Sequence, residues 1–310
     1  MNSPKYLNYE IRPFKFTERK MMLACLQRIC NHFKGNYQYI GLGGLAFTDF
    51  KLFHKELHID EMISIEAGNF SLEKLSYNSP FSFIKIINES TTTALNSLDL
   101  NKKSLIWLDY DNSLDNYMFD DITTLFSKLP EGSVFILTCN KELKDDESRV
   151  EYTTDQFKEK FSSLVPFDIS NQDFSSSSNH NTIKKMITNH INNILLNRSK
   201  VDTELNFTQL FNIVYQENRG ANMYTFGGVI HSNPSEIKDM YLTDFDFSIL
   251  QEEPYKVEIP NLTRKEVELI NSKIYTKEEE LLEMKIISES DLRKYKKSYK
   301  YIPHFYDVRT

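Results

Sequence analysis

Three glycines at a predicted strand-to-helix turn are the first residues whose type and spacing suggest chemistry. Gly41, Gly43 and Gly44 follow the short β-type run Tyr37–Ile40, and a helix is expected to start near Thr48. Glycines at such a turn let the backbone approach a ligand closely, and the N-terminus of the next helix offers unpaired N–H groups. The turn therefore predicts a ligand site, with a purely structural turn as the alternative.

An acidic residue, Glu66, follows the glycine turn at the distance expected of a ribose-binding acid. Glu66 follows Gly43 by 23 residues and ends a second predicted strand, Met62–Glu66. A carboxylate at that place can accept hydrogen bonds from the hydroxyls of a ribose. The glycine turn and Glu66 together predict a cofactor that carries adenosine, whereas the alternative for Glu66 is a solvated strand end.

Two further acids, Asp109 and Asp111, flank Tyr110 after a fourth predicted strand, Leu105–Leu108. Open α/β sheets bind ligands at the carboxyl ends of their strands, where the strand order reverses. The first and fourth strands should be neighbours at that reversal, so we expect Asp109 to share a site with the glycine turn. The alternative is that both acids solvate a loop and cap the next helix.

Three basic residues near the N-terminus have helical spacing. Arg12, Lys15 and Arg19 are three and four residues apart, so they lie on one face if Pro13 begins a helix. Such a face could clamp a carboxylate of a cofactor or substrate. A solvated basic first turn with Glu18 as its internal partner explains the pattern equally well.

The elements that must position these residues alternate along the chain. An amphipathic helix over residues 17–33 precedes five short apolar runs with helix-like segments between them. The runs cover residues 37–40, 62–66, 83–87, 105–108 and 133–138. Strands that alternate with helices imply a parallel sheet with right-handed crossovers, so we predict an α/β, Rossmann-like fold.

The later part of the chain should close the sheet. We expect a helix near Leu210 and Phe211, followed by two strands over 223–231 and 244–249 that pair antiparallel. Such an ending favours a methyltransferase sheet over that of a dinucleotide dehydrogenase.

These elements predict three parts of the chain. Residues 1–35 form an N-terminal helical segment, and 36–258 form the Rossmann-like domain with a helical insertion around 141–200. Residues 259–310 form a C-terminal helical extension, in which Thr263–Glu266 and Thr276–Glu279 have the capping-box pattern.

Four segments carry a resemblance to a known family: Arg12–Lys15 with Glu18-Arg19, Tyr39–Gly44, Ser64–Glu66 and Trp107–Asp111. Over Tyr9–Asn140 the chain resembles class I S-adenosylmethionine-dependent methyltransferases, and more narrowly a bacterial group of uncharacterised O-methyltransferases. The resemblance implies a methyltransferase fold and S-adenosyl-L-methionine as cofactor. One departure matters, because Tyr39 replaces the acid that commonly precedes the first glycine, so the methionine amine must be recognised differently.

The resemblance also implies roles for single residues. Asp109 would face the reacting methyl group and orient or deprotonate an acceptor hydroxyl or amine, with Asp111 beside it. The predicted cofactor-binding residues are Tyr39, Gly41, Gly43, Gly44, Glu66, Asn88, Glu89 and Asp109, of which Asn88 and Glu89 would contact adenine. Arg12, Lys15 and Tyr110 are the predicted substrate- or carboxylate-binding residues.

These observations leave three functions open. The first is an S-adenosylmethionine-dependent methyltransferase whose acceptor is a hydroxyl, carboxylate or amine. The second, favoured by Tyr39, is a non-catalytic protein of the same fold that binds a nucleotide or a protein partner, for example within a bacterial defence system. The third is an NAD-dependent oxidoreductase, which shares the glycine turn but leaves the antiparallel ending unexplained.

Composition excludes other classes of function. The net charge is −7 for 310 residues, which argues against a nucleic-acid partner because such proteins usually carry a basic face, although a local basic patch stays open. No apolar stretch is long enough to span a bilayer, and no signal peptide is evident, so we expect a cytoplasmic protein without a membrane partner.

Metal binding is not predicted. Cys25, Cys30 and Cys139 match no zinc spacing. His54 and His58 are four residues apart, but the residue after His54 is Lys55 rather than the glutamate of the zinc-protease motif. We interpret them as surface or packing histidines.

Overall fold

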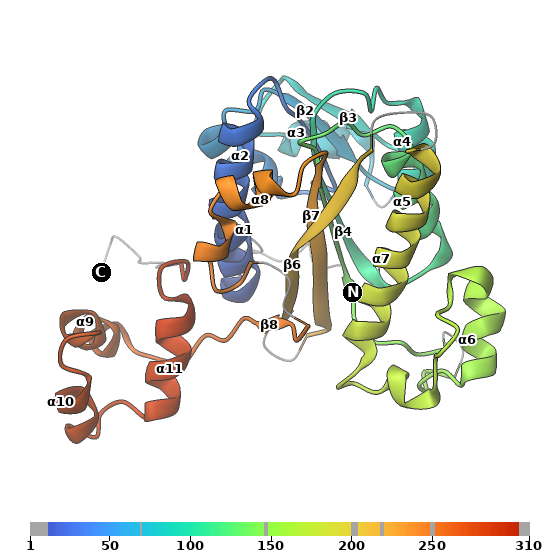
Figure 1. Ribbon diagram of the computed structural model, residues 1–310. Helices are drawn as coiled ribbons and strands as arrows, with labels where there is room; N and C mark the ends of the chain where they lie inside the picture. Colours follow the sequence, from blue (N-terminus) through green and yellow to red (C-terminus); the bar gives the residue numbers. More distant parts are fainter. Residues whose placement is uncertain are drawn as a thin grey trace.

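In the computed structural model the chain folds around one eight-stranded sheet with the strand order β3-β2-β1-β4-β5-β7-β6-β8 (Figure 1). The structure describes residues 12–68, 70–145, 148–199, 204–217, 220–248 and 252–303. The strands are β1 (Gln38–Gly41), β2 (Glu61–Ile65), β3 (Ile84–Ile87), β4 (Ser104–Ser113), β5 (Val134–Asn140), β6 (Asn206–Gln216), β7 (Asn222–His231) and β8 (Tyr255–Lys256). Among our predictions, Tyr9–Ile11, Ile249 and residues 304–310 lie outside the described residues.

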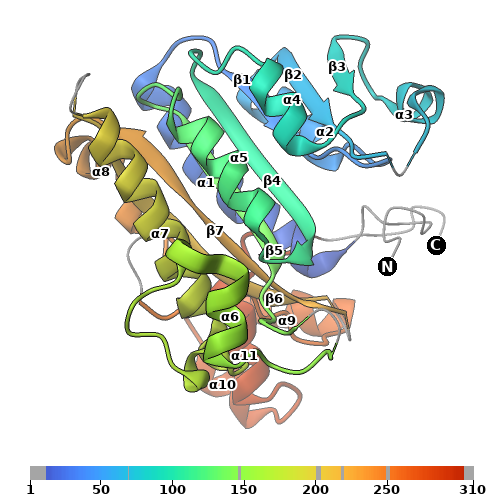
Figure 2. The same cartoon turned by 90° about the vertical axis from the view of Figure 1, so that its right-hand side faces the viewer.

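Helices cover both faces of the sheet, as the two views in Figures 1 and 2 show. Helix α1 (Pro13–Phe33) and α2 (Thr48–Leu57) share a hydrophobic core with one face, while α4 (Thr91–Ser97), α5 (Asn116–Phe126) and α7 (Asn179–Arg198) share a second core with the other. The remaining α-helices are α3 (Leu72–Asn78), α6 (Thr154–Phe161), α8 (Ser235–Asp239), α9 (Arg264–Lys273), α10 (Glu278–Glu283) and α11 (Glu289–Ser298).

The predicted parallel sheet is confirmed. Strands β1 to β5 pair parallel in the order 3-2-1-4-5, and β1 lies between β2 and β4. Tyr39 is level with Leu105, and Gly41 is level with Trp107. The carboxyl ends of β1 and β4 therefore border the same edge of the sheet, next to the reversal of strand order.

The antiparallel ending is confirmed, and the strand predicted over 223–231 is β7, but its antiparallel partner was wrongly assigned to 244–249. Strand β7 pairs antiparallel with both β5 and β6, and β6 contains Leu210 and Phe211, which we expected in a helix. The reason is burial on both faces, because α1 packs on one side of β6 and α7 on the other, so no apolar/polar alternation marks this strand.

Residues 244–248 are not a strand. Asp244 ends a 3-10 turn (Leu242–Asp244), and Arg28 of α1 donates hydrogen bonds to the Asp244 carboxylate and to the Tyr241 carbonyl. In the described part of this segment, the backbone pairing with the sheet is an isolated bridge between Phe211 and Ser248. The alternating acids and phenylalanines imitate a strand, but these contacts fold the segment back onto α1.

The strand β4 is longer than predicted. It continues through Asp109 to Ser113, with an irregular register between these two residues. Asp109 and Asp111 are therefore held by the strand itself and do not belong to a loop. The fixed backbone makes their separation and direction a property of the sheet.

The C-terminal helices α9, α10 and α11 form a small cluster beside the sheet domain, with its own core of Ile270, Leu281, Ile287, Leu292 and Tyr295 (Figure 1). The capping box at Thr263 is confirmed, whereas α10 begins at Glu278 after the N-cap Lys277, so the second predicted box is wrong. The division of the chain at residues 35 and 258 stays a prediction.

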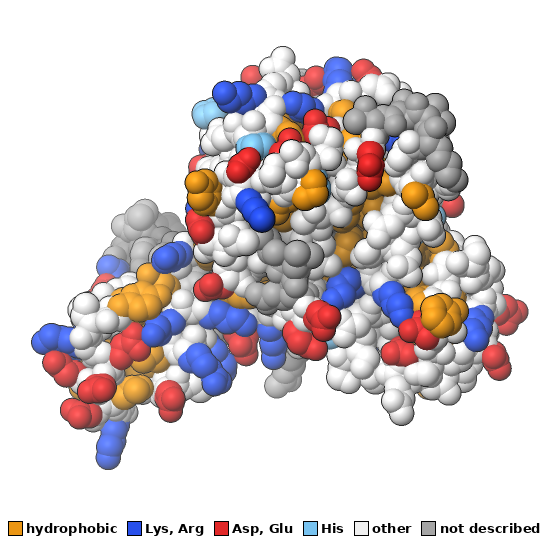
Figure 3. All heavy atoms as spheres, viewed as in Figure 1, with side chains coloured by type: hydrophobic (Ala, Val, Ile, Leu, Met, Phe, Trp, Pro, Cys, Tyr) orange, Lys and Arg blue, Asp and Glu red, His pale blue; other side chains and the backbone are white. Residues whose placement is uncertain are grey.

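The described surface is mixed in charge. Figure 3 shows lysine and arginine side chains interspersed with aspartate and glutamate over one face. Among the helices of the described segments, none combines the length and the apolar content that crossing a bilayer requires.

A substitution of Gly228 in β7 tests the pairing of β6 with β7. A Cβ atom there would lie 2.1 Å from the Thr208 carbonyl oxygen, and backbone cannot move aside as a side chain can. We predict that Gly228→Ala lowers the free energy of unfolding by about 1–3 kcal/mol in urea titrations. Gly220→Ala is the control, since its Cβ would only touch the Glu217 carbonyl at 3.0 Å. Equal stability of Gly228→Ala and the parent would contradict the register of β6 and β7.

Candidate functional site

The glycine turn and Glu66 meet directly. Glu66 follows β2, and its Oε1 accepts a hydrogen bond of 2.5 Å from the Gly44 N–H. Ser64 supports the same turn, because its hydroxyl accepts from the Gly43 N–H at 3.3 Å. Burial raises the pKa of Glu66, and the bonds from Gly44 and Ser64 oppose that rise. The acid and the turn form one unit, while the predicted binding of ribose hydroxyls by Glu66 stays a prediction.

Two of these positions require glycine for different reasons. Gly44 has φ +55°, in the left-handed region that favours glycine. A Cβ atom on Gly43 would lie 2.6 Å from the Ser64 hydroxyl and 2.9 Å from the Phe47 ring. The turn can therefore approach β2 only without side chains.

A cavity of about 560 Å³ opens above this turn, at the carboxyl ends of β1, β2 and β4. Its lining includes Leu42, Gly43, Gly44, Ile65, Glu66, Ala67, Phe70, Ser90, Thr91, Thr92, Asp109, Tyr110, Asp111, Asn112 and Tyr117, with Arg19, Thr48 and Asp49 contributed by α1 and α2. We call it the glycine-turn cavity. Its volume is in the range of about 300–1,000 Å³ that small-molecule sites occupy.

Four predicted cofactor residues do not line this cavity. Gly41 and Tyr39 lie beneath it, and a Cβ atom on Gly41 would collide with the Tyr39 side chain. Asn88 accepts a hydrogen bond from the Gly68 N–H, and Glu89 is exposed. The next three residues, Ser90 to Thr92, line the cavity in place of Asn88 and Glu89.

A second cavity, of about 730 Å³, adjoins the first through shared walls. Asp109, Asp111, Asn112 and Tyr117 line both cavities. Ion pairs surround the second one: Arg12 with Glu217 at 3.9 Å, Lys144 with Glu142 at 2.8 Å and Lys160 with Asp115 at 3.2 Å. The two predicted catalytic acids therefore lie at the junction of the glycine-turn cavity with a second, polar cavity. We call the second one the outer cavity.

Lys15 is not free to bind a ligand, which corrects the predicted basic clamp. Its ammonium lies 3.0 Å from Asp109 Oδ1 and 3.0 Å from Glu18 Oε2, and its side chain is only 1% exposed. The ring centroid of Trp107 lies 4.4 Å below the ammonium. Burial alone would lower the pKa of Lys15, but the charges of Asp109 and Glu18 raise it well above its usual range.

The three basic residues have separate partners because helix α1 is packed against the sheet. Lys15 binds Asp109 of β4, and Arg19 binds Asp49 of α2. Arg12 precedes α1 and lines the outer cavity. These long-range ion pairs, and not a shared open face, decide what each residue does.

Asp111 differs from Asp109. Among the described residues no hydrogen bond or ion pair reaches its carboxylate, and its side chain is exposed where the two cavities join. Partial desolvation by the walls of the two cavities and the neighbouring charge of Asp109 raise the pKa of Asp111. The arrangement holds one acid in place and leaves the other open to a ligand.

Tyr110 faces the side of β4 that α4 and α5 cover. Its hydroxyl donates to Asp121 Oδ2 at 2.6 Å, while Thr92 donates to Asp121 Oδ1 at the same distance. This network fixes the wall of the glycine-turn cavity at α4 and α5. Tyr110 lines the glycine-turn cavity and is not among the residues around the outer one.

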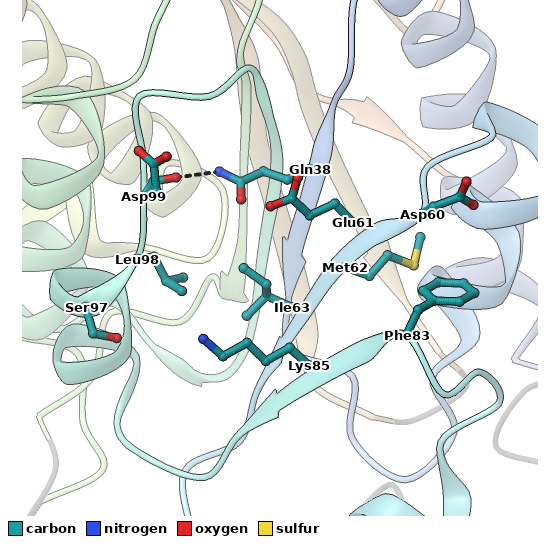
Figure 4. Close-up of a pocket in the computed structure, with 10 residues that line it drawn as sticks. All are labelled: Gln38, Asp60, Glu61, Met62, Ile63, Phe83, Lys85, Ser97, Leu98 and Asp99. Atoms are coloured by element: carbon teal, nitrogen blue, oxygen red, sulfur yellow. Dashed lines mark hydrogen bonds between the residues drawn. The ribbon is translucent and has the colours of Figure 1, made fainter.

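A further pocket lies at the opposite edge of the sheet, at the amino ends of the strands (Figure 4). Gln38, Glu61 and Lys85 line it, and Gln38 donates to the Asp99 carbonyl. It lies away from the glycine turn, so it has no part in this site.

The histidines have local partners. His54 bonds to the Ile59 carbonyl and packs against Phe81 and Phe83, and His58 caps the end of α2. In the described part of the chain no group of three or more histidine, cysteine or acidic side chains is arranged to hold a metal ion.

Strand order and site together define the class of protein. The order 3-2-1-4-5-7-6 with β7 antiparallel, and a glycine turn facing an acid at the end of β2, are the features of a Rossmann-like methyltransferase fold. The sequence family agrees with that class. The chain belongs to the family described as "Putative O-methyltransferase", whose model matches residues 7–310. No curated protein matches it in sequence.

Solved structures of similar fold include three methyltransferase-related proteins. Trm1 from Pyrococcus horikoshii, in complex with S-adenosyl-L-methionine, is 11% identical over 76% of this chain and 59% of its own, with a TM-score of 0.44. An O-methyltransferase family protein from Burkholderia thailandensis is 9% identical over 68% and 56%, with a TM-score of 0.33. The N-methyltransferase NodS from Bradyrhizobium japonicum, with S-adenosyl-L-homocysteine, is 11% identical over 72% and 88%, with a TM-score of 0.38. The chain thus spans less than two thirds of the first two proteins, and the likeness concerns the fold alone.

Sequence reasoning missed Thr48, Asp49, Thr91, Thr92 and Tyr117 as cavity residues. The start of α2 near Thr48 was predicted, and this was a usable signal, because a helix that follows the glycine turn must begin at the ligand edge. Nothing local to the sequence indicates that Asp49 meets Arg19, which is 30 residues away.

Lys15 tests the buried ion cluster. We predict that Lys15→Met lowers the free energy of unfolding by about 3–5 kcal/mol, because it leaves the Glu18 and Asp109 carboxylates without their cation. Lys20→Met, on the same helix but partly exposed, should change it by less than about 0.5 kcal/mol. Guanidinium titrations measure both. A Lys15→Met protein as stable as the parent would show that the cluster contributes nothing.

Proposed function

We propose that this protein transfers a methyl group from S-adenosyl-L-methionine to an acceptor bound in the outer cavity. The observation that carries the proposal is the junction at Asp109 and Asp111, where the glycine-turn cavity meets a second polar cavity. Methyl transfer needs two ligands side by side, and catalysis rests mainly on their alignment. Family membership supports the same reaction class.

The residues of the glycine-turn cavity fit the proposed cofactor. Glu66 Oε1 already accepts from Gly44, and a carboxylate has about four acceptor positions, so Glu66 retains capacity for ribose hydroxyls. Gly43 and Gly44 let the backbone approach the ligand. Ser90, Thr91, Thr92 and Phe70 would surround the adenine end, in place of the predicted Asn88 and Glu89.

The chemistry that the cofactor supplies when bound is an electrophilic methyl group on a sulfonium. Asp109, held by Lys15, has a fixed position on the wall shared by both cavities. Asp111 faces the same junction, and its raised pKa suits it to accept a proton from the acceptor's hydroxyl. We therefore assign proton acceptance to Asp111 and a positioning role to Asp109.

The acceptor is expected to be polar. The outer cavity is lined by charged residues of both signs and by Tyr117, Tyr152 and Tyr215. Three of its cations are already paired with acids, so the cavity offers hydrogen bonds and aromatic faces without a large net charge. The family description favours an oxygen acceptor, a hydroxyl or a carboxylate.

A non-catalytic role is the second candidate, and Tyr39 is the observation that favours it. Titration calorimetry with S-adenosyl-L-methionine, S-adenosyl-L-homocysteine and NAD separates the candidates at the level of binding. We expect both S-adenosyl ligands to bind and NAD to give no heat. Binding of NAD alone would overturn the proposal, and methyl transfer distinguishes an enzyme from a binding protein.

Glu66 provides the first test of the cofactor site. We predict that Glu66→Ala weakens S-adenosyl-L-homocysteine binding by about 1–3 kcal/mol, because it removes a charged acceptor of ribose hydrogen bonds. Calorimetry measures the change, with Glu61→Ala at the opposite end of β2 as the matched control. Unchanged affinity in a folded Glu66→Ala protein would remove this residue from the site.

Asp111 provides the test of catalysis. Asp111→Asn should keep S-adenosyl-L-homocysteine affinity within about tenfold, which is roughly 1.4 kcal/mol. It should lower the transfer of labelled methyl to the small molecules of a cell extract by about 10²–10⁴-fold, because proton acceptance is lost. Asp120→Asn, an exposed acid of α5 that lines neither cavity, is the control. An Asp111→Asn protein with full activity would contradict the assignment.

A further inference from the structure

The floor of the glycine-turn cavity holds a buried ion pair that the proposed chemistry does not use. Arg19 of α1 donates a hydrogen bond from Nε to Asp49 Oδ1 of α2. Both side chains line the cavity, although Arg19 is only 3% and Asp49 only 6% exposed. Burying two charges costs several kcal/mol per ion unless further polar partners compensate them. A charge pair at the floor of a ligand cavity therefore indicates a ligand with charges of its own.

Two buried hydroxyls lie near this pair. Thr48 Oγ1 and the Tyr39 hydroxyl are both buried, and neither has a hydrogen-bond partner among the described residues. Thr48 lines the cavity at the first turn of α2. Burial, with the nearby charges of Asp49 and Asp109, raises the pKa of Tyr39 well above its usual value. Buried polar groups are nearly always hydrogen-bonded, so the unpartnered hydroxyl of Thr48, which lines the cavity, points to a polar ligand.

The position of Tyr39 explains why a different residue must supply the acid that commonly precedes the first glycine. Its ring packs edge-on against Phe50 and Phe53 of α2, with ring centroids 4.7 and 4.9 Å away. Residue 39 therefore belongs to the core under the turn and carries no charge. Asp49, one turn upstream of Phe53 on the same helix, brings a carboxylate to the cavity floor that Tyr39 does not supply.

We propose that Arg19, Asp49 and Thr48 form the subsite for the amino-acid end of the cofactor. Asp49 receives the α-ammonium group, and Arg19 receives the α-carboxylate. A guanidinium has five N–H donors in a planar fork, so one arginine can bind two carboxylates, here Asp49 and that of the ligand. The N-terminus of the ten-residue helix α2 adds favourable electrostatics for that carboxylate. The inference rests on the proposed function, because it names the part of the same cofactor that this floor binds.

The subsite also orients the ligand. Glu66 and the Arg19–Asp49 pair lie on different elements around the glycine turn, with Gly43 and Gly44 in the wall between them. A ligand with ribose hydroxyls at one end and a zwitterion at the other satisfies both. Asp109 and Asp111 border the same cavity, where it opens to the outer one.

The test compares two ligands that differ only in the amino-acid end. S-adenosyl-L-homocysteine carries it, and 5′-methylthioadenosine lacks it. We expect Arg19→Gln and Asp49→Asn to weaken S-adenosyl-L-homocysteine binding by about 10–100-fold, the usual effect of losing a charged hydrogen-bond partner. Binding of 5′-methylthioadenosine should change by less than about threefold, within the scatter of surface substitutions. Arg28→Gln, which removes another arginine–aspartate pair of α1, is the matched control and should affect neither ligand.

The outcomes separate the subsite from the function. An unchanged ratio of the two affinities in the variants overturns the subsite, while binding of both ligands by the parent protein keeps the proposed function. Failure of the parent protein to bind either ligand overturns both. Where a variant does not fold, the parent protein is titrated with N-acetylated S-adenosyl-L-homocysteine, which has no ammonium. Equal affinity for the acetylated and free ligands then overturns the role of Asp49.

Discussion

The buried ammonium of Lys15 is the interaction on which the site depends. It joins helix α1 to the carboxyl end of β4 by binding Asp109, and it neutralises Glu18 within its own helix. Without a cation at this place, two carboxylates would be left in an apolar environment formed by Trp107 and Tyr215. Lys15 therefore fixes both the direction of Asp109 and the packing of α1. The wall between the two cavities follows from that contact.

Charges are distributed around the glycine turn in a way that matches one kind of ligand. Glu66 is on the β2 side, the Arg19–Asp49 pair is at the floor, and Asp109 with Asp111 lies at the opening to the outer cavity. Each group is supplied by a different element, so only the assembled fold brings them together. Helix α1 contributes to two of the three groups, through Lys15 and Arg19, which makes it part of the site and not only a cover for the sheet.

The sequence predicts some parts of this arrangement well and others not at all. Local periodicity and glycine punctuation locate β1 to β5, and the structure places Glu66 beside the glycine turn at the end of β2. Strand β6 escaped prediction because it is buried on both faces and shows no alternation. Lys15 was wrongly expected to bind a ligand, because its true partner, Asp109, is 94 residues away in the sequence. Such a pairing depends on how α1 packs on the sheet, which local patterns do not show. Asp49 was missed for the same reason.

A crystal structure of the protein with S-adenosyl-L-homocysteine tests the site most directly. We predict density in the glycine-turn cavity, with the ribose hydroxyls on Glu66, the amino-acid end on Arg19 and Asp49, and the sulfur facing Asp111. A ligand bound elsewhere, such as the pocket at the amino ends of the strands lined by Gln38 and Lys85, would contradict it. So would a ligand in the cavity with its amino-acid end directed away from Asp49.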